Sequence, residues 1–561
     1  IRDLVRSRGL GDVYKRQGIK FASTFSYDFV MNKSRAWKDP RTSDGDDDNG
    51  RFSKDYNDIT NMTWSNILTY QTKIKKKHNL DLLAGYEINS KESDGLGTTI
   101  SNFARWDKPE VNNGVVYQSM GGSNSTTRIV SYITRANYDY DNKYYLGASW
   151  RTDGSSRLAR ENRWGNFWSL SGAWRVSSES FMKPLQNWLS DLKLRVSYGV
   201  NGTLPSSYYG YMGLSSLTSN YNDNPGITQS QLENKELTWE TNYNFNSGID
   251  LGFFDNRLNV TFEYYVRTTK NLLYSRPLSL ATGFSSYLAN IGKLQNKGYE
   301  LEIRSTNIET KDFRWSTSLN LGHNANKILK LDGDLKQVTS GTSIHKVGLP
   351  YSTYYMIEFA GIDPVDGEPM FYKNTTDENG NLNKETTKDP RSAEKVILQC
   401  ADPTITGGLG NSISYKWFDL NFNVNFSFGA WNYDGAAGKL EHGGDGTLNI
   451  PIYYRKRWQK EGDETSIERF VVGRSISMTD YATTRRLYSG DYVRLKNLTF
   501  GFTLPKTWTR KVGIDNIRLY ASGNNLLTWA AYDYIDPESG SSPSWDTPPM
   551  RTYTFGLEVK F

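Results

Sequence analysis

Apolar and polar side chains alternate along many segments of this chain. In the clearest segment, WFDLNFNVNFSF at 417–428, one face from Phe418 onward carries only Phe, Leu and Val, and the other carries Asp, Asn and Ser. Shorter alternating segments lie at 18–29, 143–151, 191–200 and 257–266. Alternation with period two predicts β-strands whose two faces meet different surroundings. These segments hold nine to twelve residues, which suits tilted strands that cross a bilayer.

The carboxyl-terminal segment 551–561, RTYTFGLEVKF, alternates up to its last residue. One face carries five apolar side chains, namely Tyr553, Phe555, Leu557, Val559 and Phe561. The closing strand of an outer-membrane barrel has this pattern, with apolar side chains toward lipid. The last strand of a soluble sandwich has it too, because alternation shows only that one face is buried.

Connections of different length favour the barrel. Short and long connections alternate along the chain. The short ones are at 140–142, 253–257, 414–417 and 504–511, and the long ones are at 92–126, 201–240, 267–296, 325–403 and 429–488. Outer-membrane barrels join their strands by short periplasmic turns and long outer loops, whereas a sandwich requires no such order. The sequence therefore predicts an all-β protein, a transmembrane antiparallel up-and-down β-barrel with about sixteen strands in this chain.

The apolar phase slips once, within residues 491–503. It changes from Val493 and Leu495 to Leu498 and Phe500. A slip by one residue predicts a β-bulge.

The composition is consistent with a β-barrel and argues against several other classes of protein. Only 37% of the residues are hydrophobic and no run of eighteen apolar residues occurs, so no helical span is expected. A barrel tolerates such polarity because half of each strand faces water, and the 14% aromatic content suits its aromatic girdles. The single cysteine, Cys400, excludes an internal disulfide framework and a cysteine zinc site. The net charge of +6 has no dominant basic block and gives no case for nucleic acid.

The first seventeen residues, IRDLVRSRGLGDVYKRQ, differ from the rest. They are basic and lack an apolar core, so they predict neither a secretory signal nor a strand. We interpret 1–17 as a non-native, adaptor-like segment and expect the barrel to occupy 18–561.

A longer stretch carries a family resemblance. Residues 143–182, KYYLGASWRTDGSSRLARENRWGNFWSLSGAWRVSSESFM, resemble the barrel of SusC/RagA-type TonB-dependent receptors, with Leu158 in place of the family's Phe and Trp168 in place of its Pro. Further similar stretches follow in the same order at 191–202, 236–258, 290–308, 359–372, 492–505 and 517–529 and in the terminal strand. The resemblance covers essentially residues 18–561.

The resemblance implies an importer and its partners. Family members have about twenty-two barrel strands, preceded by a carboxypeptidase-regulatory-like domain, a TonB box and a plug. It therefore implies that this chain is a partial barrel domain, with plug and TonB box in a missing amino-terminal region. The implied partners are a SusD-like surface lipoprotein, the TonB complex, outer-membrane lipid, and an oligosaccharide or peptide ligand. It also implies that the terminal aromatic face from Tyr553 to Phe561 serves as a barrel-assembly signal.

No catalytic constellation is expected. The sequence has no GxSxG elbow, HExxH or phosphate loop, and no cofactor is expected. Aromatic side chains in long loops are candidates for ligand or lid contact, because sugar rings stack on aromatic faces. They are Trp106, Tyr117, Tyr208, Tyr209, Tyr211, Trp431 and Tyr433. The alternative is that they belong to the aromatic girdle or pack the loops.

One acidic run resembles a calcium loop weakly. In SDGDDDNGRFSKD at 43–55, the carboxylates of Asp44, Asp46, Asp48 and Asp55 have suitable offsets. Asn49 occupies the position of the usual Gly, and Asp55 replaces the usual Glu. A solvated loop tip is the competing interpretation.

The sequence thus predicts an outer-membrane, SusC-like TonB-dependent nutrient importer. A passive porin or adhesin barrel without a plug is one rival, distinguished by whether a plug and TonB box exist upstream. A soluble, secreted carbohydrate-binding or hydrolytic β-protein is the second, and it would need no detergent for extraction.

Overall fold

The computed structural model describes most of the chain as β-structure. The described residues are 14–16, 18–222, 224–331, 333, 335–377, 380–444, 449–472, 481–532, 534–539 and 549–561. Within them, sixteen strands contain nine or more residues, in agreement with the predicted number. None of the described helices is long and apolar enough to cross a bilayer.

The chain divides into two compact units. Unit 1 comprises Ile1–Trp174, Arg195–Phe245 and Thr269–Ile291, and unit 2 comprises Arg175–Leu194, Asn246–Thr268 and Gly292–Phe561. Four strands run through the ranges of both units, namely β7 (Trp164–Arg175), of which only Arg175 lies in unit 2, β8 (Leu189–Thr203), β11 (Glu240–Phe253) and β12 (Leu258–Lys270).

Unit 1 is built on long antiparallel neighbours. Its strands are β1 (Tyr14–Arg16), β2 (Ile19–Lys38), β3 (Arg51–Ile74), β4 (His78–Phe103), β5 (Gly114–Tyr140), β6 (Tyr144–Ser155), β7 (Trp164–Arg175), β9 (Leu214–Tyr221), β10 (Asn224–Gln231), β13 (Leu273–Pro277) and β14 (Ser286–Asn290), with the 3-10 helices η1 (Val111–Asn113) and η4 (Leu280–Thr282). From β2 to β7 each strand pairs with the next one along the chain. This up-and-down order is the one that the alternating segments predicted.

Unit 2 repeats this order. Its longer strands are β15 (Lys293–Glu309), β16 (Phe313–Lys330), β24 (Ile405–Tyr415), β25 (Phe418–Phe428), β28 (Tyr492–Thr503), β29 (Asn516–Ala530) and β30 (Thr552–Lys560). Each of these pairs antiparallel with the next in this series. Four further helices of this unit lie in connections, namely η2 (Val176–Ser178), η3 (Ser180–Leu185), α2 (Lys506–Thr509) and η8 (Arg510–Val512).

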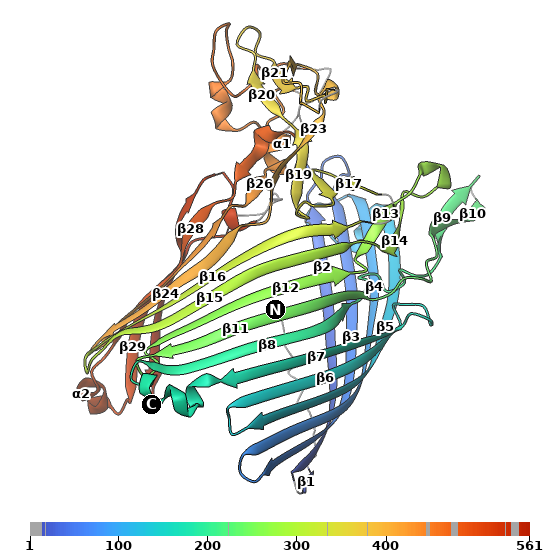
Figure 1. The fold of residues 1–561 in the computed structure, drawn as a ribbon. Helices are drawn as coiled ribbons and strands as arrows, with labels where there is room; N and C mark the ends of the chain where they lie inside the picture. Colours follow the sequence, from blue (N-terminus) through green and yellow to red (C-terminus); the bar gives the residue numbers. More distant parts are fainter. Residues whose placement is uncertain are drawn as a thin grey trace. The chain divides into compact units, whose positions relative to one another are not determined.

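The described residues within 331–403 and 429–491 of unit 2 form what we call the loop body. It contains β17 (Gln337–Ser340), β18 (Ser343–Lys346), β19 (Thr353–Ile357), β20 (Phe359–Ile362), β21 (Pro369–Tyr372), β22 (Thr386–Thr387), β23 (Lys395–Cys400), β26 (Trp431–Tyr433), β27 (Leu487–Ser489), α1 (Gly435–Leu440), η5 (Pro390–Ser392), η6 (Ile452–Lys456) and η7 (Thr484–Arg486). A further helix, η9 (Pro537–Ser539), follows β29. Figure 1 shows the short strands β19, β20, β21 and β23 gathered beyond one end of the long strands of unit 2, while α2 lies at the opposite end.

One face of the long strands is apolar and exposed. On β2 the exposed side chains include Phe21, Phe25 and Phe29, and on β30 Phe555 is 83% exposed. A water-soluble protein rarely exposes so many large apolar side chains in rows. Lipid satisfies them, as on the outer face of a membrane-spanning barrel.

This lipid face gives a direct prediction. Leu170 on β7 is 55% exposed, whereas the neighbouring Ser169 hydroxyl lies on the other face, 2.6 Å from the Ser149 hydroxyl. We expect Leu170→Arg to destabilise the protein in a bilayer by about 2–4 kcal/mol, because lipid solvates the guanidinium poorly. Urea unfolding in lipid vesicles measures this change, and Ser169→Arg is the matched control. Equal losses in both variants would contradict a lipid-facing Leu170.

The predicted bulge is present in β28. Val424 of β25 pairs with Leu495, whereas the preceding Asn423 pairs with Asn497, so Lys496 has no partner residue across this ladder. The register with β29 shifts at the same place. The extra residue explains why the apolar phase slips there.

Three expectations about local structure are wrong. The long loop predicted at 92–126 is largely strand, because β4 and β5 pair through it and leave only a short connection after Phe103. Asp55, expected in a loop, lies in β3 opposite Ser34. Tyr14–Arg16 forms a short strand with β2, although no strand was expected before residue 18, and residues 1–13 and 17 of the adaptor-like segment lie outside the described residues.

Candidate functional site

A polar face opposes the apolar face on β12, β15, β16, β24 and β25 in unit 2. We call it the polar wall. It carries Asn259, Thr261, Glu263, Glu300, Glu302, Arg304, Ser316, Ser318, Asn320, Asn421, Asn423 and Asn425. Alternation puts the polar side chains of neighbouring strands at matching positions. For example, Asn320 of β16 lies opposite Gly408 of β24, and Gly408 lies opposite Asn425 of β25.

Glycines of β24 make room for these side chains. A Cβ atom on Gly410 would lie 2.6 Å from the Ser318 Oγ and 2.9 Å from the Asn423 Oδ1. Both distances are too short for a carbon atom. Glycine therefore lets side chains of two flanking strands lean across a third.

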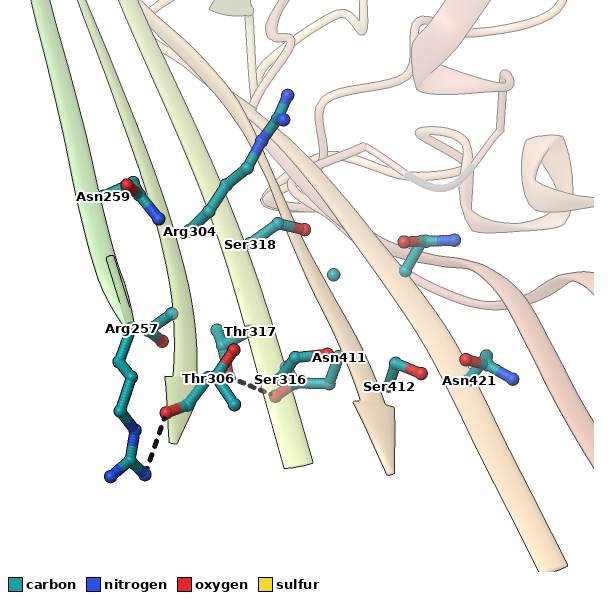
Figure 2. Close-up of a pocket in the computed structure, with 13 residues that line it drawn as sticks. Arg257, Asn259, Arg304, Thr306, Ser316, Thr317, Ser318, Asn411, Ser412 and Asn421 are labelled. Carbon is teal, nitrogen blue, oxygen red and sulfur yellow. Dashed lines mark hydrogen bonds between the residues drawn. The ribbon is translucent and has the colours of Figure 1, made fainter. Parts of the chain in front are cut away.

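A recess of about 340 Å³ opens along this wall (Figure 2). Near its end, Arg257 donates a hydrogen bond of 3.5 Å to the Thr306 carbonyl oxygen. On the opposite face of the same strands, the Thr317 hydroxyl donates one of 2.8 Å to the Asn411 Oδ1, in register with Phe422. Figure 2 shows the Arg304 side chain extending across the strands and away from Arg257. This surface offers hydrogen bonds and two guanidinium groups, and it suits a hydrated polar ligand or a polar protein surface.

The loop body contains a buried ionic cluster. Glu468 is fully buried, and its carboxylate lies 2.5 Å from the Arg485 guanidinium. Glu441 accepts a hydrogen bond of 3.2 Å from the buried Arg486. Burial opposes the charge of Arg485, but Glu468, Tyr454 and Glu441 together outweigh it and hold the pKa of Arg485 above its ordinary value. The cluster is held together by two carboxylates and two guanidinium groups.

Tyrosine hydroxyls complete this cluster. Tyr453 donates a hydrogen bond of 2.5 Å to Glu441, and Tyr454 donates one of 3.0 Å to Glu468. Burial and these carboxylates raise the pKa of both phenols above the ordinary range. Both hydroxyls therefore stay protonated and keep donating at neutral pH.

A second group of tyrosines packs on the first. Tyr532 donates a hydrogen bond of 3.1 Å to Asp434 and stacks on Tyr488 at 3.7 Å between ring centroids. Tyr534 lies 5.3 Å from the Tyr532 ring and 5.4 Å from the Tyr453 ring. We call Tyr453, Tyr532 and Tyr534 the tyrosine platform.

A buried arginine fixes the segment that carries two of these rings. Arg494 of β28, whose side chain is 3% exposed, forms ion pairs of 2.7 Å with Asp536 and with Glu538. It also donates a hydrogen bond of 3.0 Å to the Thr528 hydroxyl. Lys496 adds a pair of 2.6 Å with Glu538. At the bulge, Arg494 and Lys496 of β28 therefore both contact the segment 534–539.

The predicted loop aromatics of unit 1 have several environments. Trp106 lies 3.5 Å from the Arg41 guanidinium, and Tyr117 is an exposed residue of β5 rather than of a loop. Tyr209 accepts a hydrogen bond of 3.0 Å from the Thr126 backbone. Two others complete the set, since Tyr208 faces the Arg157 guanidinium and Tyr211 packs against the Leu158, Phe167, Leu237 and Trp239 cluster.

The two predicted aromatics of unit 2 pack inside the loop body. Trp431 and Tyr433 of β26 contact the cluster of Tyr354, Met356 and Leu487. Neither belongs to the tyrosine platform. Their assignment as ligand contacts stays a prediction.

The acidic run at 43–55 is engaged in protein contacts. Asp44 accepts a hydrogen bond of 2.6 Å from Thr42, and Asp48 pairs with Arg51. Asp55 accepts a hydrogen bond of 2.9 Å from Ser34. Within the described ranges no group of three or more His, Cys, Asp or Glu side chains is placed to hold a metal ion. Calcium binding by Asp44, Asp46, Asp48 and Asp55 stays a prediction.

Sequence reasoning missed the tyrosine platform. Its members lie in two segments that are distant in sequence, so no local spacing joins them. The signal that was available is the density of tyrosine in YDY at 532–534 and in YY at 453–454.

Comparison with known proteins points to one family. A profile described as "TonB dependent receptor-like, beta-barrel" matches residues 4–526. TonB-dependent receptor P3 of Formosa agariphila is 32% identical over 97% of this chain and 56% of its own length. TonB-dependent receptor SusC of Bacteroides thetaiotaomicron is 30% identical over 77% of this chain and 44% of its own length.

Solved structures agree with these relatives. The structure of the RagAB peptide transporter has a TM-score of 0.86 and 27% identity, and the match covers 98% of this chain and 60% of that chain. The chain spans about half the length of the curated relatives that it matches.

Proposed function

The chain belongs to the TonB-dependent receptor family as an outer-membrane β-barrel of the SusC/RagA type, and from this premise we propose that it forms part of an importer of oligosaccharides. The polar wall is the observation that carries the proposal. It puts amides and hydroxyls on the face opposite to lipid, where a barrel encloses its aqueous interior.

The chemistry of the wall supports an oligosaccharide as ligand. Asn and Ser side chains of β16 and β25 both donate and accept hydrogen bonds, which suits the hydroxyls of sugars. A peptide is the second candidate. It is favoured by the similarity to the RagAB peptide transporter and by the Glu300 carboxylate, which suits a cationic side chain.

Transport would require partners beyond this chain. We propose a SusD-like surface lipoprotein that delivers the ligand, and a TonB complex that acts on an amino-terminal region. We also propose that residues 18–561 are a partial barrel domain, with plug and further strands in that region. The greater length of the relatives supports this arrangement. The relatives are receptors and transporters by name, and we propose no catalytic role.

Uptake by living cells tests the importer. The gene with its genomic flanks is deleted from its native strain and then restored, and uptake of labelled oligosaccharides and of labelled peptides is measured. We expect uptake of oligosaccharide to fall to background on deletion, to return on complementation, and to stop when a protonophore collapses the inner-membrane proton gradient. Sequencing of the upstream flank is expected to show a plug and a TonB box in the same reading frame.

Two results would contradict this proposal. Uptake that persists with protonophore and rises linearly with concentration would indicate a passive porin. Loss of peptide uptake alone would assign the second candidate ligand.

A further inference from the structure

We infer that the tyrosine platform of the loop body, Tyr453, Tyr532 and Tyr534, binds an uncharged sugar ring by stacking. This inference deepens the proposed import of oligosaccharides and rests on it. The platform lies outside the aromatic residues that the sequence singled out as ligand contacts, and it is independent of the polar wall.

The exposed ring of Tyr534 is the stacking surface. Tyr534 is 71% exposed, although both neighbouring rings of the platform are partly buried. Its ring is tilted by 55° against Tyr532 and by 60° against Tyr453. Two supporting rings thus contact Tyr534 while most of its side chain stays open to solvent. Sugar C–H groups favour such a π-face.

The supporting rings are held in place from below. The hydroxyl groups of Tyr453 and Tyr532 donate hydrogen bonds to Glu441 and Asp434, respectively. Hydrogen bonding to a carboxylate fixes each ring and increases electron density on it. A prearranged aromatic surface loses little conformational entropy when a ligand binds.

The charges behind the platform disfavour an anionic ligand. Glu441 and Glu468 are balanced by Arg485 and Arg486, and Asp536 with Glu538 is balanced by Arg494 with Lys496. Each of these cations forms an ion pair with a carboxylate of its group. The fifth carboxylate, Asp434, accepts the Ala437 backbone N–H at the start of α1. The set thus holds five carboxylates and four cations, and its net charge of −1 disfavours a sulfated sugar or a uronic acid.

Binding to defined probes tests the platform. The full chain is refolded in detergent, and isothermal titration calorimetry measures binding of a neutral glucan heptasaccharide, a neutral galactan hexasaccharide, an oligogalacturonate and a trilysine peptide. We expect at least one neutral probe to bind. We expect Tyr534→Ala to weaken this binding by about tenfold, the equivalent of about 1.4 kcal/mol, and Tyr534→Phe to retain it because the ring remains.

Tyr221→Ala is the matched control. Tyr221 is 84% exposed at the end of β9 in unit 1, and its removal should leave the affinity unchanged. Neutral-probe binding that is equal in Tyr534→Ala and in the unsubstituted chain would overturn the platform while leaving the importer intact. Binding of the charged probes alone would overturn the uncharged ligand class. Absence of glycan binding together with absence of cellular uptake would overturn both proposals.

Discussion

Replacement of Arg494 by alanine is expected to release residues 534–539 from the end of β28. The guanidinium is buried and pairs with Asp536 and Glu538, so its removal leaves two carboxylates with only Lys496 as a nearby cation. Loss of one member of a buried ion cluster costs about 3–5 kcal/mol, mainly because the remaining charge is uncompensated. Because Tyr534 belongs to the same segment, binding of a neutral glycan should weaken as well.

Limited proteolysis with mass-spectrometric mapping measures this release. We expect a new cleavage site within 531–539 in Arg494→Ala and retention of the remaining fragments. Arg518→Ala is the matched control, because Arg518 pairs with Asp419 at 2.6 Å but both side chains are about a quarter exposed. Because solvent reaches this pair, we expect it to contribute less than the buried pairs of Arg494. Identical cleavage of the two variants would show that Arg494 does not fix this segment.

Strands whose two faces meet different surroundings could be predicted from the sequence. Phe418 to Phe428 alternates without interruption, and β25 has those bounds. The slip of the apolar phase predicted a bulge within 491–503, and the structure places it at Lys496, because one extra residue inverts the apolar phase. In both segments, lipid or water on each face selects the type of each residue, so the signal can be read from a short stretch of sequence.

Strands that extend into outer loops could not be predicted in this way. Residues 92–103 and 114–126 of β4 and β5 are rich in Ser, Gly and Thr and lack apolar alternation. They become strands because each continues the hydrogen-bonded ladder of its neighbour, and Gly97 pairs with Gly121 in that ladder. Polar surroundings on both faces remove the periodic signal while the pairing persists.

The sequence predicted the polar character of the candidate site but not all of the residues that form it. The Asn side of 418–428 indicated a wet face, and this face is part of the polar wall. The tyrosine platform depends on contacts between Tyr453 and Tyr534, which are far apart in the sequence. Such contacts follow from how the loops fold on one another, and no spacing within one loop encodes them.

Replacement of Glu468 by alanine is expected to loosen the loop body itself. Glu468 is fully buried between Arg485 and the Tyr454 hydroxyl, so alanine leaves a buried guanidinium with only the more distant Glu441 carboxylate, at 3.7 Å. The expected cost is about 3–5 kcal/mol. Hydrogen–deuterium exchange should show faster exchange of the backbone amides in η6 and η7, which carry Tyr454 and Arg485, and unchanged exchange in β24 and β25.

Two comparisons separate the lost charge pair from a general loss of folding. Glu464→Ala removes an exposed carboxylate from the same segment and should leave exchange in η6 and η7 unchanged. Glu468→Gln keeps an acceptor for Tyr454 but removes the charge that faces Arg485, so its exchange should be intermediate. Equal exchange in Glu468→Ala and Glu464→Ala would mean that packing alone holds the loop body. The loop body would then need no ionic cluster to keep Tyr453 in the tyrosine platform, and Glu468→Ala would bind a neutral glycan as the unsubstituted chain does.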